Sequence, residues 1–131
     1  MNLLLKVIVA LPALLFIVLG VRWLVDPAAI APEFGMTALT GAGLSTQVGD
    51  LSAFFLTLGL CILTGLVTGN RTWFYPPVML LLLATLGRLI AWLVHDAALA
   101  LPMILVEVIV SALLLLASAR LAEDGRVNAD D

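Results

Sequence analysis

Four stretches of predominantly apolar residues constrain this chain more than any other feature of its sequence. They run from about Leu3 to Val25, Val48 to Thr68, Tyr75 to Val94 and Leu99 to Leu121. A helix needs roughly 20 apolar residues to cross about 30 Å of hydrocarbon, so each stretch is long enough to span a membrane. Charged residues make up only 11% of the chain, whereas soluble domains carry about 25%. The sequence therefore predicts an integral membrane protein of the all-α class.

The connections between these stretches predict how the spans are arranged. The links at residues 70–71 and 95–96 are short, and short links join antiparallel neighbours in helical bundles. We expect one four-span transmembrane domain, residues 1–121, followed by a frayed acidic tail, residues 122–131. The predicted fold is a four-helix bundle with antiparallel up-down spans and one long first loop.

The long first loop covers residues 26–47. Asp26 followed by Pro27 is typical of the N-cap and first position of a helix, which predicts a short helix through Ile30. The rest of the loop combines glycines with scattered apolar residues, so we expect it to lie along the membrane surface. A plain linker is favoured over a flap that covers a binding site.

The distribution of basic residues predicts the orientation of the bundle. An even number of spans places both termini on one side, and that side collects four of the six basic residues. The four are Lys6, Arg71, Arg120 and Arg126, and the other two are Arg22 and Arg88. By the positive-inside rule, both termini are expected in the cytoplasm and the long loop outside.

Four ionisable residues are expected at membrane depth toward the outer side: Arg22, Asp50, Arg88 and Glu107. Arg88 lies near the end of the third span and Glu107 near the start of the fourth, so antiparallel packing brings them to a similar depth. An unpaired charge at mid-span costs about 2.5–3.5 kcal/mol on insertion scales. We therefore expect Arg88 to pair with Glu107 and Arg22 with Asp50, or a mixed network of all four.

A stripe of small and weakly polar residues predicts one contact face of the second span. Thr57, Cys61 and Thr64 recur at intervals of three or four residues, and Ser111 shares a side of the fourth span with Glu107. Membrane helices place small and hydroxyl-bearing residues at their contacts, so we predict that this stripe faces other helices. Because Cys61 is the single cysteine, an intrachain disulfide and a cysteine-based metal site are excluded.

The charged residues allow three interpretations. They form structural clasps, they surround the polar end of a lipid, quinone or other amphiphile, or their carboxylates perform acid-base catalysis. The third interpretation is disfavoured because each carboxylate has an arginine available to stabilise its ionised form. The sequence contains no nucleotide-binding glycine loop, zinc-ligand spacing or basic stripe for nucleic acid.

Short motifs distributed over the spans resemble those of a known family. They are Arg22-Trp23 followed by Asp26-Pro27, then Gly49-Asp50, Gly87-Arg88 and Glu107. With these motifs in this order, the chain resembles an uncharacterised family of small bacterial membrane proteins within the DoxX-like group. The resemblance covers nearly the whole chain and implies a four-helix bundle in the bacterial inner membrane. Relatives in the wider group are associated with quinone-linked sulfur redox systems and with the assembly of membrane receptors.

These observations favour a non-enzymatic accessory or assembly subunit whose charge cluster stabilises the bundle. The first alternative is a binding protein for an amphiphile, with the four charged residues around its polar end. A solute channel is third, because one small four-helix bundle offers little room for a pore unless it oligomerises. The sequence has no haem, flavin or iron-sulfur ligand set and no metal site, so no such cofactor is expected. A lipid or a quinone is the expected class of bound small molecule. Expected partners are membrane lipids, with other membrane proteins or a second copy of the chain as alternatives, and no nucleic acid.

Overall fold

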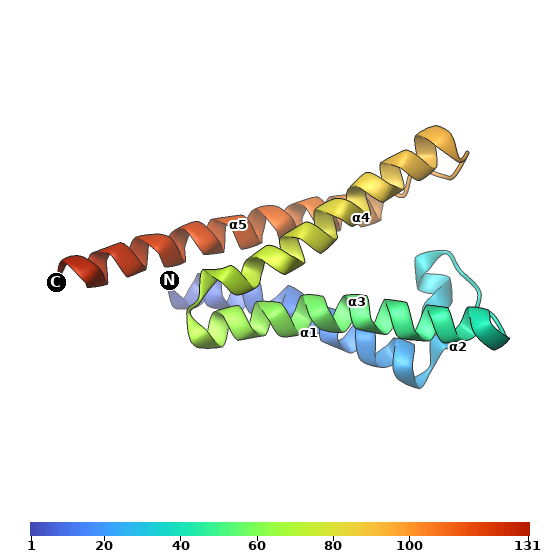
Figure 1. Cartoon of the computed structure of the whole chain (residues 1–131), viewed down its shortest axis with the longest axis horizontal. Helices are drawn as coiled ribbons and strands as arrows, with labels where there is room; N and C mark the ends of the chain where they lie inside the picture. Colours follow the sequence, from blue (N-terminus) through green and yellow to red (C-terminus); the bar gives the residue numbers. More distant parts are fainter.

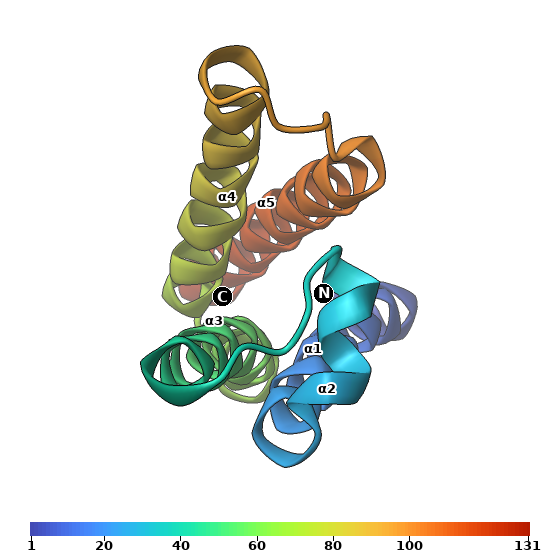
Figure 2. The same ribbon diagram turned by 90° about the vertical axis from the view of Figure 1, so that its right-hand side faces the viewer.

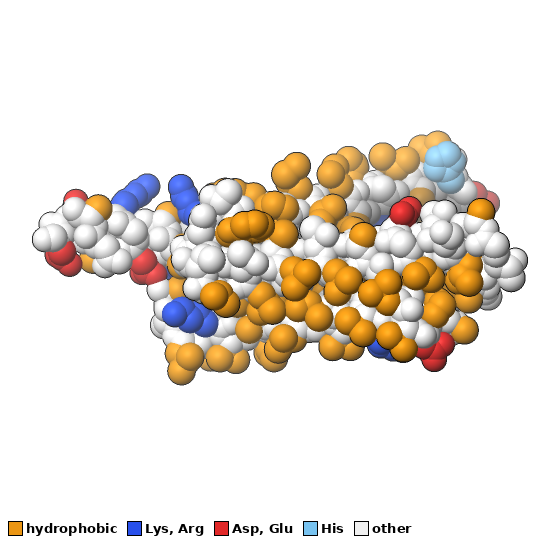
Figure 3. Space-filling view, turned by 60° about the horizontal axis from the view of Figure 1, so that its bottom comes forward, with side chains coloured by type: hydrophobic (Ala, Val, Ile, Leu, Met, Phe, Trp, Pro, Cys, Tyr) orange, Lys and Arg blue, Asp and Glu red, His pale blue; other side chains and the backbone are white.

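The computed structural model describes all residues from Met1 to Asp131, and its only regular structure is helical. The long helices are α1 (Leu3–Val25), α3 (Gly41–Thr68), α4 (Tyr75–Val94) and α5 (Leu101–Asp130), and the short elements are α2 (Pro27–Ile30) and the 3-10 turns η1 (Ala31–Phe34) and η2 (Arg71–Phe74) (Figure 1). All four long helices are long and apolar enough to cross a membrane. Large apolar side chains remain exposed over the middle of the molecule, and most charged side chains lie toward its ends (Figure 3). These features indicate a multi-pass helical membrane protein.

The bundle consists of two helix pairs. α1 packs along α3, and α4 packs along α5. We call the end that holds both termini and η2 the terminal end, and the end that holds residues 26–40 and 95–100 the long-loop end (Figure 1). The pairs meet where α3 passes through η2 into α4, and they diverge toward the long-loop end, which Figure 2 shows from the front. The packing therefore leaves room between the pairs at the long-loop end.

Two glycines allow α1 and α3 to pack closely. A Cβ atom on Gly59 would lie 2.5 Å from Ile17 Cγ1 and 2.6 Å from the carbonyl oxygen of Ala13. A Cβ atom on Gly20 would lie 2.7 Å from Leu56 Cγ. Lipid provides no hydrophobic drive between helices, so such close backbone approach is a main source of their packing energy. This pair therefore forms the more closely packed half of the bundle.

The terminal end is held by contacts between distant parts of the chain. Phe74 in η2 has no exposed surface. Ser118 Oγ on α5 donates a hydrogen bond to the Tyr75 hydroxyl at 3.2 Å. The N-terminal ammonium of Met1 forms an ion pair with Asp124 near the end of α5. These contacts join all four long helices at this end.

The structure agrees with some predicted helix boundaries and corrects others. α4 covers the predicted residues Tyr75–Val94, whereas α3 begins at Gly41 instead of Val48. α5 continues to Asp130 instead of ending at Leu121, so the acidic tail is helical and not frayed. The apolar pattern marks only the part of a helix that lies in lipid, and the backbone hydrogen bonds continue beyond it.

The long first loop begins with the predicted short helix and is then tied to α3. The Asp26 carboxylate accepts a hydrogen bond from the backbone N–H of Ala29 at 3.3 Å, and the following proline occupies the first turn of α2. Further along, the Gln47 side chain accepts from the N–H of Leu39 at 2.8 Å and donates to the carbonyl of Thr37 at 3.0 Å. Both ends of the loop are therefore anchored to a long helix.

The middle of this loop is part of the hydrophobic core. Ile30 and Ala31 have no exposed surface. The ring of Phe34 lies 6.2 Å from the ring of Trp23 and 5.2 Å from the ring of Phe55, measured between centroids. The prediction of a plain linker is therefore wrong, because these apolar side chains are buried by packing on the bundle. The segment forms a cap on the long-loop end (Figure 2).

Candidate functional site

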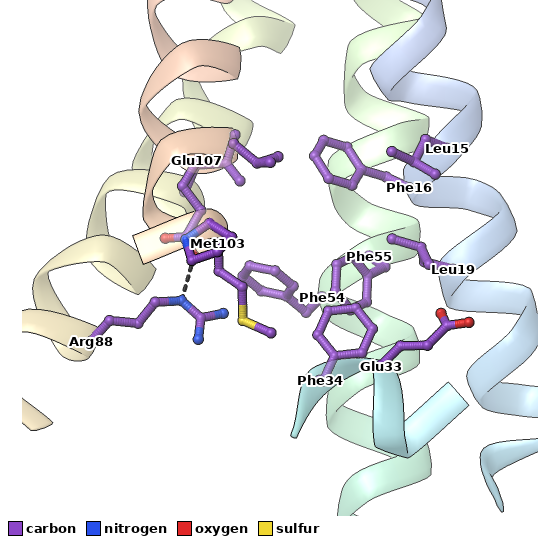
Figure 4. Close-up of a pocket in the computed structure, with 13 residues that line it drawn as sticks. Leu15, Phe16, Leu19, Glu33, Phe34, Phe54, Phe55, Arg88, Met103 and Glu107 are labelled. Carbon is purple, nitrogen blue, oxygen red and sulfur yellow. Dashed lines mark hydrogen bonds and ion pairs between the residues drawn. The ribbon is translucent and has the colours of Figure 1, made fainter. Parts of the chain in front are cut away.

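A cleft of about 340 Å³ lies between the two helix pairs, below the cap. Its lining comes from all four long helices and from η1: Leu15, Phe16, Leu19, Glu33, Phe34, Phe54, Phe55, Leu81, Arg88, Pro102, Met103, Val106 and Glu107 (Figure 4). Nine of these 13 residues are hydrophobic, so the cleft is apolar except near its charged side chains. Ligand pockets in proteins commonly have this size and this composition.

Arg88 on α4 and Glu107 on α5 form a direct ion pair at one wall of the cleft (Figure 4). Arg88 lies six residues before the end of α4, and Glu107 lies six residues after the start of α5. Both are therefore about 9 Å along their helices from the long-loop end. This agrees with the similar depth predicted from the sequence. The hydroxyl of Thr85 donates a second hydrogen bond to Glu107 Oε2 at 2.8 Å. Two neighbouring donors thus satisfy both oxygens of this carboxylate.

The Arg88 guanidinium has hydrogen-bonding capacity left over. Only its Nε donates to Glu107, and its two terminal amino groups point away from Glu107 toward the cleft (Figure 4). The Arg88 side chain is 33% exposed, whereas that of Glu107 is 8% exposed. The buried carboxylate therefore positions the arginine, and the arginine presents free N–H donors to the hollow.

Four phenylalanines form the wall opposite Arg88. The ring of Phe55 lies 5.2 Å from Phe54, 5.2 Å from Phe34 and 6.1 Å from Phe16. They come from α1, η1 and α3, so the close α1–α3 pair and the folded-back cap together build this wall. Aromatic clusters of this kind are stiff and offer large apolar surfaces for an apolar chain or a flat ring.

The cleft opens sideways toward the surroundings of the helices. At the opening between α1 and α5, Leu15 and Val106 are exposed at 51% and 47%. A second hollow of about 340 Å³ adjoins it between α3 and α4. It shares Phe34, Phe54, Phe55, Arg88 and Met103 with the first. In a membrane, both openings would face hydrocarbon, and an apolar chain could extend through either one.

The structure places Arg22 and Asp50 outside the expected cluster. Arg22 donates two hydrogen bonds to the carboxylate of Glu33, at 2.8 and 3.1 Å. Asp50 is exposed on α3 and forms no ion pair. The expected pairing of Arg22 with Asp50 is wrong, because the cap folds back and brings Glu33 to the end of α1. The charged groups therefore form two separate ion pairs: Arg88–Glu107 lies in the cleft lining, and of Arg22–Glu33 only Glu33 reaches it.

Of the predicted contact stripe on α3, the structure contradicts Thr57. Thr57 is exposed, and Cys61 and Thr64 are only partly buried. The buried face of α3 carries Ser52, Phe55, Leu58, Gly59, Ile62 and Gly65. Thr64 needs no partner on another helix, because its hydroxyl donates to the backbone carbonyl of Leu60 at 2.7 Å. Ser111 does lie at a helix contact, with 2% exposure.

Sequence reasoning did not identify Glu33 and the phenylalanine wall. Asp26-Pro27 signals a new helix start directly after α1, but it does not indicate that Glu33 reaches Arg22. Nothing in the sequence indicates that Phe54 and Phe55 face a hollow, since aromatic residues also pack in closed cores.

The arrangement can hold a hydrogen-bond acceptor at Arg88 and an apolar group against the aromatic wall. The structure has no group of three or more His, Cys, Asp or Glu side chains placed to hold a metal ion. Comparisons with models of known protein families, with curated proteins and with solved structures found no match.

Proposed function

We propose that this protein binds an amphiphilic small molecule, such as a lipid or quinone, in the cleft between its two helix pairs. The polar end of the ligand would contact Arg88, and its apolar part would lie against the phenylalanine wall. The observation that supports this proposal is the set of free guanidinium N–H groups directed into an otherwise apolar hollow. Sequence alone favours an accessory subunit with a structural clasp, and the cleft changes that preference.

The geometry of the ion pair argues for more than a clasp. An arginine that only neutralises a carboxylate in a membrane commonly uses two of its nitrogens in a bidentate contact. Here Glu107 binds Nε alone and takes its second hydrogen bond from Thr85. Each N–H group left without an acceptor in an apolar setting costs free energy. A bound acceptor would remove that cost, which is a physical reason for ligand affinity.

The proposal can be tested by filling the cleft. Met103 lines both hollows and stands beside the Arg88 guanidinium (Figure 4). Met103→Trp should occupy the space for the polar end of a ligand. The matched control is Met79→Trp on α4, because Met79 is 61% exposed and lines neither hollow. Both variants and the original chain would be purified in a mild detergent, and native mass spectrometry would measure retained small molecules.

We expect the original chain and Met79→Trp to retain the same amphiphile and Met103→Trp to lose it. Size-exclusion chromatography and a thermal melt would show that Met103→Trp is folded. Equal retention by a folded Met103→Trp variant would place the molecule elsewhere and refute the proposal.

We also propose the finer topology that the sequence predicts. The four spans would run antiparallel through a bacterial inner membrane, with both termini in the cytoplasm and the cap outside. The pairing of Met1 with Asp124 supports a common side for the termini, and the excess of basic residues supports the cytoplasm. Membership of the DoxX-like group stays a prediction. A reporter fused after Asp131 should indicate the cytoplasm, and a periplasmic signal would refute this orientation.

An accessory or assembly role is the second candidate, and Asp50 is the observation that favours it. This carboxylate is exposed on α3 and has no ion-pair partner in its own chain. A charge that faces lipid is costly, so a partner helix with a basic or hydroxyl group would stabilise it. Asp50→Leu should then abolish any oligomer or complex that mass photometry detects in detergent. An unchanged assembly would remove this support.

A further inference from the structure

We propose that the ligand of the cleft has an uncharged head group that accepts hydrogen bonds, as the carbonyl oxygens of a diacylglycerol or another acyl ester do. This inference rests on the proposed binding function and specifies its ligand class. It depends on which donors, acceptors and charges of the cleft are still free.

The cleft offers hydrogen-bond donors but no free carboxylate. Both oxygens of Glu107 are occupied, one by Arg88 Nε and one by the hydroxyl of Thr85. Both oxygens of Glu33 are occupied by the terminal amino groups of Arg22. The terminal amino groups of Arg88 remain, and a guanidinium can only donate. A ligand head at Arg88 must therefore supply acceptors, and an ammonium head group there would be repelled by the guanidinium charge.

The cleft lining carries no excess positive charge. Its charged residues are Arg88, Glu107 and Glu33; Arg88 is paired with Glu107, and Glu33 is paired with Arg22, which lies outside the lining. A phosphate or carboxylate at Arg88 would compete with the buried charge of Glu107 and add a second anion that no cation neutralises. Burying an uncompensated charge is strongly unfavourable, whereas a neutral carbonyl loses little hydration and gains a hydrogen bond to a charged donor.

The apolar lining accommodates the chains of such a ligand. The phenylalanine wall faces Arg88 across the cleft. The cleft opens between α1 and α5, and the adjoining hollow opens between α3 and α4. One acyl chain could leave through each opening into lipid while the ester oxygens stay at Arg88. A two-chain ester therefore fits both the polar and the apolar parts of the hollow.

The test compares two lipids with the same acyl chains, one with a neutral hydroxyl head and one with an anionic phosphate head. Dioleoylglycerol and dioleoyl phosphatidate would be added in equal amounts to the delipidated protein in detergent, and native mass spectrometry would count each bound species. The original chain should prefer dioleoylglycerol by about tenfold or more.

Glu107→Gln should reverse this preference. Glutamine keeps an acceptor for Arg88 Nε but removes the negative charge, which leaves Arg88 in the cleft without its counter-ion. The matched control is Glu123→Gln on the exposed part of α5, where the carboxylate pairs only with exposed Arg120. This control should leave the preference unchanged.

Each outcome separates this inference from the proposed function. The proposal of a neutral head group would be refuted if the original chain preferred phosphatidate, or if Glu107→Gln left the lipid preference unchanged. If Met103→Trp still abolished binding in that case, the cleft would remain the binding site. If Met103→Trp bound both lipids normally, the proposed function would fail, and this inference would fail with it.

Discussion

Replacing Arg88 with leucine would leave the carboxylate of Glu107 buried and without its cation. The Glu107 side chain is only 8% exposed, so water cannot replace the lost partner, and one hydrogen bond from Thr85 would remain. Removing one member of a buried ion pair typically costs about 3–5 kcal/mol. We expect Arg88→Leu to lower the free energy of unfolding by an amount in this range.

The reverse change should cost less. Glu107→Leu leaves Arg88 without its anion, but that side chain is 33% exposed and long enough to turn its head group toward the membrane surface. We expect a loss of roughly 2 kcal/mol. The double variant has no unpaired charge and should lose only about 1–2 kcal/mol, because an apolar pair of similar volume replaces a buried ion pair at little cost. The coupling energy between the positions should therefore exceed about 2 kcal/mol.

The assay is a double-mutant cycle on unfolding in mixed detergent micelles, followed by far-UV circular dichroism. Glu123→Leu provides a matched carboxylate removal at an exposed site, and its effect should simply add to that of Arg88→Leu. A coupling energy below about 0.5 kcal/mol between Arg88 and Glu107 would refute the argument, because it would mean that the pair does not interact in the folded protein. Equal losses for the two single variants would instead refute the reasoning from unequal burial.

Three further predictions concern other parts of the bundle. Gly59→Leu should destabilise the protein by about 3 kcal/mol or more, because the new Cβ atom would clash with α1. The control is Gly87→Leu, where a Cβ atom would meet nothing within 4 Å, and it should change stability little in the same unfolding assay. Cys61, which is partly exposed within the apolar span of α3, should resist a water-soluble maleimide in intact membranes, because a thiol in hydrocarbon does not ionise. Rapid labelling would indicate an aqueous cavity. Glu33→Gln should lower the free energy of unfolding by less than about 1 kcal/mol, because the ion pair of Glu33 with Arg22 is well exposed. A loss above about 2 kcal/mol would instead show that this ion pair is needed to keep the cap packed on the bundle.

Local composition determines where the spans lie, because crossing a bilayer depends on the length of an apolar run and on little else. The sequence alone places α4 at Tyr75–Val94 and the start of α2 after Asp26. It also predicts the contact of Arg88 with Glu107. A short link fixes the relative height of two consecutive helices, so counting residues is enough to find groups at equal depth.

The buried face of α3 is a property of the tertiary structure. This helix carries two rows of small residues, one through Thr57 and Cys61 and one through Gly59 and Gly65. In water, polarity would identify the row through Thr57 and Cys61 as the exposed one. In lipid, polarity is a poor guide, because a hydroxyl group that is hydrogen-bonded to its own helix can face hydrocarbon. Steric fit against Ala13 on α1 selects the glycine row instead.

The partner of Arg22 and the existence of the cleft were likewise decided by the tertiary structure. Asp50 and Glu33 are both carboxylates at short sequence distance from Arg22, and only the folded-back path of the cap selects Glu33. The cleft exists because the tight α1–α3 pair and the α4–α5 pair meet at the terminal end and diverge toward the long-loop end. The sequence determines which helices form and which consecutive groups share a depth, since both follow from local rules. The angle between the helix pairs depends on many distant contacts at once, so the structure was needed to reveal the cleft.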